Sequence, residues 1–433
     1  MHWPTVEERS KLGQARRKQV RRQDHGELKP KQRSHSALDL LQRAAHGRIP
    51  QLLKLKWQLM ADSPFGYFRG AAAVMAADLS VLPSTGILTQ ICGDAHVRNL
   101  GAFAAPDGRL VFDINDFDET IRGPFEWDLK RMAASLVLAG REAGHKDASA
   151  GAAAELCIQH YAELMQTLAR MTAIDASRFQ VHRIGEVQPI QDALLKAERS
   201  TPLHTLEGLT EPVGESHARR FKEDKPMLTR LAGRQAAEVL AGLTPYGQML
   251  EPQRQHLLGF YRPVDVAFKV VGTGSVGLRD YCIYLEGNDT GDPLFLQFKE
   301  EPASAYAPYL PDAHPPAHNG QRVAEGQRAM QIQSDPFLGW ARIAGRDFLV
   351  RQLNDHKGSI EIGDLAGKRL AAFAGVCGEL LARSHARAGD PVTIAGYIGS
   401  GGGFAEALAD FGLRYADQTE KDRAELRKGL RAR

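Results

Sequence analysis

The stretch Cys92–Phe103, CGDAHVRNLGAF, carries an aspartate, a histidine, an arginine and an asparagine between positions 94 and 99. It is followed at 112–119 by FDINDFDE, which contains Asp113, Asp116 and Asp118. The segment GILTQICGD before this stretch and the segment GRLVFDIN after it are rich in residues that favour strands. We therefore predict a polar loop between two short strands, the second of them at Leu110–Ile114, with the aspartates at its end.

The aspartates alternate with the apolar residues Phe112, Ile114 and Phe117, which favours a position beside a packed element. Uncompensated carboxylates are costly there, so a metal ion or a basic side chain would have to offset them. A solvated strand end is the simpler interpretation. If a metal binds, Asp116 is the first choice of ligand, and Asp118 or Asp113 is the reserve.

Composition sets the broad class of the protein. The chain has 433 residues, 43% of them hydrophobic and 25% charged, with a net charge of +3. These values are typical of globular proteins, and the net charge predicts no strong general affinity for polyanions. Four dispersed cysteines indicate neither a zinc module nor a disulfide framework, and they fit a reducing compartment. The charged N-terminus does not resemble a signal peptide, so we expect a cytoplasmic protein without a membrane segment.

Residues 11–33 are rich in lysine and arginine. A solvated, partly disordered tail is the interpretation we favour, because no aromatic or base-reading residue is interleaved with the charges. The alternative is a contact for nucleic acid, a membrane surface or an acidic partner. Nucleic acid is therefore expected as a partner only through this tail, if at all.

A glycine-rich turn joins two strand-like runs in VDVAFKVVGTGSVGLRDYCIYLEG, which begins at residue 264. The turn contains Gly272, Gly274, Ser275 and Gly277. In a dinucleotide-binding fold such a motif opens a helix, whereas here an alternating, strand-like sequence follows it. A glycine turn between two strands is the arrangement of the kinase loop that covers nucleotide phosphates. An ordinary hairpin turn that needs positive φ is the alternative.

Lys299 ends a third strand-like run, PLFLQFK, shortly after the glycine turn. In a kinase-like fold this position holds the lysine that binds phosphate, and the lysine pairs with an acid on the next helix. Glu325 lies on a helical pattern and is the expected partner. Glu300 and Glu301 compete for that role, although adjacent residues of a strand point to opposite faces. A surface lysine on an edge strand is the alternative.

The spacing from Asp94 to Asn99 is that of kinase-like catalytic loops. There the aspartate orients or accepts the proton of the attacking hydroxyl, the asparagine holds magnesium, and a later aspartate, here Asp116, binds the metal that bridges the phosphates. His96 is expected to order the loop. Arg69, a lone arginine in apolar GYFRGAA, is expected either to face a phosphate or to form an ion pair with an acid such as Asp128.

These motifs resemble those of kinase-like enzymes of the aminoglycoside-phosphotransferase and choline-kinase type. Cys92 departs from the pattern, because a histidine is usual at that position. The residues that match are Gly93, Asp94, His96, Asn99, Asp116, Phe117, Gly123, Asp128 and Leu129.

From about residue 60 onward the chain also resembles an uncharacterised bacterial family of unknown function. The shared motifs are FRG at 68–70, GDAHxxN, NDFDE, GxGSVG, QxKE and SDPFLGW at 334–340. This second resemblance implies a shared fold and a shared site, but it implies no substrate.

The resemblances imply an α+β, two-lobed protein-kinase-like fold. Because the catalytic-loop motif precedes the glycine loop, the fold would be circularly permuted. We expect a basic N-terminal tail with helices at 1–59 and a catalytic-lobe segment at 60–150. A mostly helical insertion at 151–261, a nucleotide-binding lobe rich in strands at 262–353 and the helical remainder of the catalytic lobe at 354–433 complete the expected order.

The sequence thus predicts a phosphotransferase that uses ATP and Mg²⁺ and acts on a hydroxyl of an unidentified acceptor, a small molecule or a protein. The predicted site consists of Asp94, His96 and Arg69 for catalysis, Asn99, Asp116 and Asp118 for the metal, and Gly272, Gly274, Ser275, Gly277, Lys299 and Glu325 for the nucleotide. A nucleotide-binding protein without catalysis, or one that transfers AMP, is the alternative. A metallophosphoesterase fits less well, since AHNG at 317–320 lacks the acid and the paired histidines of that class.

Overall fold

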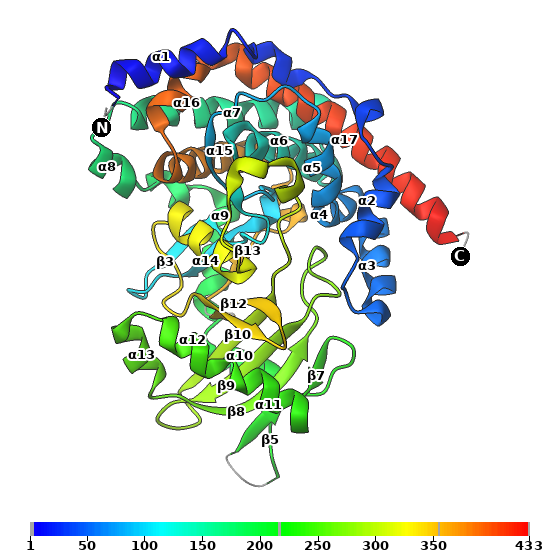
Figure 1. Ribbon diagram of the computed structural model, residues 1–433, viewed down its shortest axis with the longest axis vertical. Helices are drawn as coiled ribbons and strands as arrows, with labels where there is room; N and C mark the ends of the chain where they lie inside the picture. The colour runs from blue at the N-terminus through cyan, green and yellow to red at the C-terminus, as the bar shows by residue number, and fades with distance from the viewer. Residues whose placement is uncertain (1–3, 215–217, 354–355, 432–433) are drawn as a thin grey trace.

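The computed structural model describes residues 4–214, 218–353 and 356–431. Most helices gather at one end of the molecule, and a six-stranded sheet forms the other end (Figure 1). We call these the helical part, residues 4–200 and 356–431, and the sheet part, residues 201–353. Helices and strands are both present and largely separate, so the expected α+β class is confirmed. The expected boundaries at 1, 354 and 433 fall on residues outside the described ranges.

The helical part is built by two stretches of chain that flank the sheet part in sequence. Its helices are α1 (Val6–Arg16), α2 (Ala37–Ala44), α3 (Pro50–Asp62), α4 (Pro64–Gly70), α5 (Ala72–Ser80), α6 (Phe125–Glu142), α7 (Asp147–Leu168), α8 (Ala173–Arg178), α9 (Gln188–Arg199), α15 (Arg369–Ala388), α16 (Pro391–Ile398) and α17 (Gly402–Arg431).

Helix α6 lies at the centre of the helical part and packs against α4, α7, α15 and α17. Its residues from Phe125 to Gly140 are all buried. The sequence predicts one apolar face for this helix, but neighbours surround it on all sides, and its charged residues are buried with the rest. A helix in that position must pair its charges internally.

Two small sheets in the helical part carry the loops predicted to be functional. Strand β1 (Leu88–Ile91) pairs with β4 (Ile121–Pro124), and β2 (Leu100–Ala104) lies between β3 (Leu110–Ile114) and β13 (Gly358–Ser359). The predicted strand at 110–114 is thus present as β3. Cys92–Asn99 connects β1 to β2, and Asn115–Thr120 connects β3 to β4.

The large sheet has the strand order β11-β12-β10-β9-β8-β7. Neighbouring strands are antiparallel, and the glycine turn links β8 to β9. The strands are β7 (Leu228–Arg230), β8 (Arg262–Lys269), β9 (Asp280–Glu286), β10 (Pro293–Glu300), β11 (Gly339–Ile343) and β12 (Arg346–Gln352). The other elements of the sheet part are α10 (Pro202–Leu209), the pair β5 (Thr210–Pro212) and β6 (Arg219–Phe221), α11 (Gly233–Ala241), α12 (Leu243–Met249), α13 (Pro252–Leu258) and α14 (Asn319–Met330).

The two faces of the large sheet differ in chemistry. One face is apolar, with residues such as Phe298 and Val350, and it packs against α11 and α12. The opposite face carries Lys299, which lies across from Asp280, and Gln297, which lies across from Arg351. Because side chains alternate along a strand, β10 sends Phe298 to the apolar face and Lys299 to the polar one.

Two expectations about the chain's organisation change. The segment 151–261 is mostly helical as predicted, but it also contributes β5, β6 and β7, the last of which joins the large sheet. The basic segment 11–33 is not a solvated tail. Arg17 and Arg22 donate hydrogen bonds to carbonyls of Tyr397 and Ile398 at 2.7 and 2.8 Å, and buried Arg33 pairs with Asp78 at 2.7 Å.

Across the described residues, none of the helices combines the length and the apolar character that crossing a membrane requires.

Candidate functional site

Asp128, a buried carboxylate on α6, binds the backbone of the loop that follows β1. Asp128 accepts hydrogen bonds from the backbone N–H groups of Cys92 and Gly93 at 2.8 and 2.9 Å. The Nε2 of His385 on α15 lies 3.2 Å from Asp128 Oδ2, the oxygen that also accepts from Cys92. Gly93 has φ +80, and a Cβ there would lie 2.3 Å from the carbonyl oxygen of Glu119, so only glycine fits. These contacts fix where the next residue, Asp94, presents its carboxylate.

Asp94 lies between an arginine and a histidine. The Arg131 Nε donates to Asp94 Oδ1 at 2.5 Å, and the His96 Nε2 lies 3.6 Å from Oδ2. Burial raises the pKa of Asp94 more than the charge of Arg131 lowers it. Burial, together with the charges of Arg69 and Arg131, lowers the pKa of His96 well below its ordinary value, so this imidazole is neutral at neutral pH. A carboxylate held in this way can accept a proton while staying in position.

Asn99 and the aspartates lie together at the open end of the β2–β3 hairpin, where Leu100 pairs with Ile114. Asn99 donates from its Nδ2 to the Asp94 carbonyl at 2.9 Å, and its own carbonyl accepts from the N–H of Asn115 at 2.9 Å. The Asp118 N–H reaches Asp116 Oδ1 at 3.3 Å. Asp113, the reserve ligand, points elsewhere and pairs with Arg383 of α15 at 2.5 Å.

Lys299 on β10 meets these aspartates although it lies 181 positions away in sequence from Asp118. Its Nζ lies 2.5 Å from Asp118 Oδ1 and 3.7 Å from Asp116 Oδ1. Burial alone would lower the pKa of Lys299, but the two carboxylates raise it above its ordinary value. Burial alone would raise the pKa of Asp118, yet the charge of Lys299 lowers it, whereas burial and the neighbouring Asp118 raise the pKa of Asp116.

The glycine turn closes over the same cluster. Ser275 Oγ donates to Asp118 Oδ2 at 3.2 Å. Gly277 has φ +92, and a Cβ there would lie 3.1 Å from the Cβ of Arg48, so a larger residue would be strained. The turn therefore reaches Asp118 through Ser275.

Helix α3 and the turn before it hold the glycine turn on its outer side. Lys56, which is buried, donates to the carbonyls of Thr273 and Gly274, each at 3.1 Å. The Arg48 guanidinium donates to the Val276 carbonyl at 2.7 Å, and the Ile49 N–H donates to the Gly277 carbonyl at 2.7 Å. The carbonyls of the turn thus bind the N-terminal segment.

Arg69 lies beside the glycine turn, with Gly272 and Gly274 as neighbours. The expected ion pair with Asp128 does not form, and the buried Nε of Arg69 has no hydrogen-bond partner among the described residues. Burial and the charge of Arg98 lower the pKa of Arg69, and the charges of Asp94 and Asp116 act in the opposite direction. Arg69 is therefore a cation near the aspartates that still has an unused donor.

The structure does not bring Glu325 to Lys299. Glu325 lies on the exposed face of α14 and accepts a hydrogen bond from Gln321 at 2.7 Å. The buried face of α14 instead presents Arg322, which donates to the carbonyls of Thr120 and Asp118 at 2.7 and 2.8 Å. The helix thus reaches the aspartate loop through an arginine rather than an acid.

Glu301 is the buried carboxyl that accompanies Lys299 in place of Glu325. It is 2% exposed, and neither side-chain oxygen has a hydrogen-bond partner among the described residues. Burial and the charge of Asp118 raise its pKa well above the ordinary value, although Lys299 and Arg322 act in the opposite direction. Glu301 is therefore a buried carboxyl near Lys299 whose neutral form is favoured and whose oxygens make no hydrogen bond with a described residue.

Within the described ranges, no group of three or more histidine, cysteine, aspartate or glutamate side chains is arranged to hold a metal ion. Asn99, Asp116 and Asp118 nevertheless offer hard oxygen atoms of the kind that Mg²⁺ binds together with substrate phosphates. These three residues fit a magnesium ion whose other ligands come from a substrate and from water.

Sequence reasoning missed several charged residues of the site: Arg131, Arg322, Arg351 and Lys56. Each is buried or half-buried, and each has partners far away in sequence. Periodicity could not show that neighbours surround α6 on all sides and bury its charged residues. Glu301 was named only as a competitor of Glu325, and the QxKE motif ends one residue before it.

Comparison with known proteins gives one result. Residues 48–429 match the model of a family described as "uncharacterized protein conserved in bacteria (DUF2252)". The chain belongs to this family. The match begins at Arg48, the residue that packs against the glycine turn, and it includes both the aspartate loops and the sheet. No curated protein and no solved structure matches the chain significantly.

Proposed function

We propose that this DUF2252 protein is a phosphotransferase that uses ATP and Mg²⁺ to phosphorylate a hydroxyl group. The observation that carries the proposal is the meeting of three distant segments. Lys299 lies 3.7 Å from Asp116, Ser275 of the glycine turn donates to Asp118, and the loop with Asp94 lies alongside. Kinase-like enzymes combine the same parts, a glycine loop, a strand lysine, a base and a metal-binding aspartate.

The order of these parts along the chain supports a circularly permuted kinase-like arrangement. The end of α15 lies beside the start of the Asp94 loop, since Thr89 Oγ1 donates to the His385 carbonyl at 3.2 Å. In a kinase with the usual order, the helix before the catalytic loop would occupy this place. Here that helix comes near the C-terminus, and the sheet lies between the two halves of the helical part.

Asp94 is proposed to act as the base. It takes the proton of the acceptor hydroxyl while the acceptor oxygen bonds to the terminal phosphorus and the bond from that phosphorus to the ADP oxygen breaks. Arg131 positions the Asp94 carboxylate, and neutral His96 fills the loop beside it. Catalysis of this kind depends on positioning and on charge neutralisation.

Asn99 and Asp116 would hold magnesium, with Asp118 as a further ligand, and the ion supplies charge neutralisation for the phosphates when bound. The Nδ2 of Asn99 is used by the Asp94 carbonyl, which leaves its Oδ1 for a ligand. Lys299, Arg69 and the N–H groups of the glycine turn would bind the phosphates. Lys299 would then exchange Asp118 for phosphate oxygens, and Glu301 is the buried acid next to it.

Calorimetric titration with a non-hydrolysable ATP analogue tests nucleotide binding. We expect binding that requires Mg²⁺ and that Lys299→Ala weakens by at least about tenfold, the loss of one charge-assisted contact. Glu325→Gln is the matched control because its carboxyl is exposed. Absence of binding with and without Mg²⁺ would refute the proposal.

Turnover is tested with labelled ATP and a pool of metabolites and proteins as acceptors. Asp94→Asn should bind the nucleotide normally and transfer at least about a hundredfold less phosphate, the contribution expected of a general base. A variant that retains full transfer would remove Asp94 from this role.

A further inference from the structure

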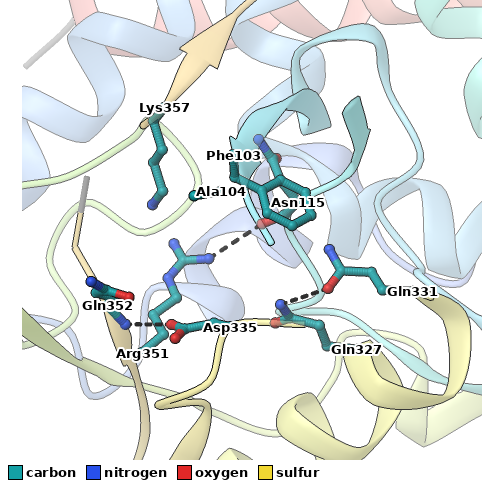
Figure 2. Close-up of a pocket in the computed structure, with 9 residues that line it drawn as sticks. All are labelled: Phe103, Ala104, Asn115, Gln327, Gln331, Asp335, Arg351, Gln352 and Lys357. Atoms are coloured by element: carbon teal, nitrogen blue, oxygen red, sulfur yellow. Dashed lines mark hydrogen bonds between the residues drawn. The ribbon is translucent and has the colours of Figure 1, made fainter. Parts of the chain in front are cut away.

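A cavity lies where β12 ends, between the sheet part and the β2–β3 hairpin (Figure 2). Its empty space is about 460 Å³ with the mouth included, but the centre of a water molecule can reach only about 50 Å³ of it. The cavity therefore suits a group of a few atoms. Asn115 lines it and directly precedes Asp116, so the cavity adjoins the proposed site without including Lys299 or Asp94.

Two cations face each other in this cavity. Figure 2 shows Lys357 extending from the loop after β12 towards the guanidinium of Arg351. Arg351 donates from Nε to Gln297 Oε1 at 3.0 Å and from Nη1 to the Asn115 carbonyl at 3.2 Å. Its Nη2 has no hydrogen-bond partner in the part of the chain that the structure describes. Arg351 is thus fixed in place with one donor left over.

Lys357 makes no hydrogen bond or ion pair with any described residue, although it is largely withdrawn from solvent. Burial, and after it the positive charge of Arg351, lowers the pKa of Lys357 to about 7. An unpaired ammonium next to a guanidinium is unfavourable, since like charges repel and neither is fully hydrated. A negatively charged group from outside the described residues would relieve this arrangement.

The one carboxylate in the described lining of the cavity offsets only part of this charge. Asp335 accepts hydrogen bonds from the backbone N–H groups of Phe337, at 2.8 Å, and of Gln352, which hold the loop before β11 to the end of β12. Its charge acts on Lys357 against that of Arg351, but it forms no direct ion pair with either cation among the described residues. Two cations and one carboxylate therefore leave this lining with a net positive charge.

The remaining walls are polar but uncharged. Gln327 of α14 donates to Gln331, the residue after that helix, at 3.0 Å, and the side-chain amides of Asn115 and Gln352 complete the polar wall. Phe103 of β2 supplies an apolar surface. Such walls can solvate the outer oxygens of an anion and cover a short carbon chain.

We propose that this cavity binds an oxyanion, the phosphate or carboxylate group of a small molecule, between Arg351 and Lys357. An arginine whose Nη2 group makes no hydrogen bond with a described residue, and a lysine with a flexible side chain, are a favourable pair for such a group. The site is separate from the proposed phosphate site at Lys299. Because Arg351 also contacts Asn115, occupancy would stabilise the backbone immediately before Asp116.

The test uses the full-length protein labelled with ¹³C at the ε-carbon of lysine, and inorganic phosphate or acetate as probe. In NMR spectra the Lys357 resonance, assigned by its loss in Lys357→Gln, should titrate near neutral pH. Saturating phosphate should raise that midpoint by about one pH unit, which corresponds to an about tenfold preference of the anion for the charged lysine. A response to phosphate but not acetate would identify a phosphate group, and the reverse a carboxylate.

Variants separate this site from the nucleotide site. Lys299→Ala should leave the response of Lys357 to phosphate unchanged, and Arg351→Gln should weaken it by about tenfold. Lys368→Gln, which removes an exposed lysine, is the matched control and should have no effect. The proposal is overturned if neither anion moves the Lys357 midpoint, or if Lys299→Ala abolishes the response. Failure of Mg²⁺-dependent nucleotide binding would leave this result unaffected.

Discussion

Lys299 and Lys357 are both withdrawn from water, yet their surroundings are opposite in charge. Lys299 lies against Asp118 and Asp116, and Ser275 closes the same cluster. Lys357 faces Arg351 and forms no ion pair with a described residue, although the carboxylate of Asp335 lines the same cavity. Accordingly the pKa of Lys299 is raised, and that of Lys357 is lowered to about 7.

The difference shows which of the two regions is complete without a ligand. A paired cluster is stable by itself, and a ligand must compete with the internal pairs to enter it. An unpaired cation is stabilised only when a ligand arrives. Binding at Lys299 should therefore reorganise the protein, whereas binding at Lys357 should mainly relieve repulsion.

The largest expected effect is that of Lys299→Met. Removing one partner from a buried charge cluster should lower the free energy of unfolding by about 3–5 kcal/mol, because the carboxylates remain buried. Urea unfolding followed by circular dichroism measures this. The double variant Lys299→Met/Asp118→Asn should lose less than the sum of the two single variants. Wild-type stability in Lys299→Met would show that the pair is not formed in solution.

Lys56→Met should have a smaller effect on stability. It keeps the buried stem but removes the two hydrogen bonds to the glycine turn, at a cost of about 1–3 kcal/mol. Hydrogen exchange should quicken at the N–H groups of Ser275 and Val276, which bond to the Gly272 carbonyl. Lys54→Met, an exposed lysine on the same helix, is the control and should leave both quantities unchanged.

Lys357→Met should change the free energy of unfolding in the opposite direction to Lys299→Met, when measured in a buffer without phosphate or carboxylates. Replacing the unpaired cation should raise the free energy of unfolding by about 1 kcal/mol at pH 7. In the unfolded chain a lysine has a pKa of about 10.4, so between pH about 7 and about 10 the unfolded wild type binds more protons than the folded one. Wild-type stability rises across this window by up to about 1.4 kcal/mol per pH unit, so the advantage of the variant should disappear within about one to two pH units above 7. A variant less stable than the wild type at pH 7 would contradict the comparison.

Glu325→Gln should have the smallest effect, within about 0.5 kcal/mol, because its carboxyl is exposed. Glu301→Gln is the informative partner, since it keeps the shape of a buried, neutral group. If Glu301 takes over the pairing of Lys299 when phosphates bind, only Glu301→Gln should weaken nucleotide binding in titration calorimetry. Equal effects of the two variants would remove Glu301 from that role.

Much of the fold follows from local patterns in the sequence. Alternation and the glycine turn predicted the strands that became β8, β9 and β10, and the pattern at 110–114 predicted β3. The short strands β5 to β7 were missed, because three-residue strands have too few positions for alternation to appear. The segment 11–33 was misjudged because its arginines bind carbonyls and carboxylates of segments that are hundreds of residues away.

The candidate site was predictable where a motif has fixed spacing, as from Asp94 to Asn99. Partners supplied by tertiary packing were not predictable. Arg131 occupies a position on α6 that looks like the polar face of an amphipathic helix, and only the neighbours on that side show that it is buried. Glu325 was chosen over Glu301 from helical spacing, which cannot tell which face of α14 points to the sheet.

The division of the helical part into two sequence segments also sets an order of assembly during synthesis. Arg9 of α1 pairs with Asp390, 381 positions later, and α7 packs along α15. The whole of the sheet part therefore leaves the ribosome before these late helices exist. Until then α6 and α7 lack their apolar neighbours, so the nascent chain exposes a surface that favours aggregation. A chain that stops before α15 would retain that exposure, so the vulnerable period of translation runs from the end of α7 at Leu168 to the synthesis of α15, which begins at Arg369.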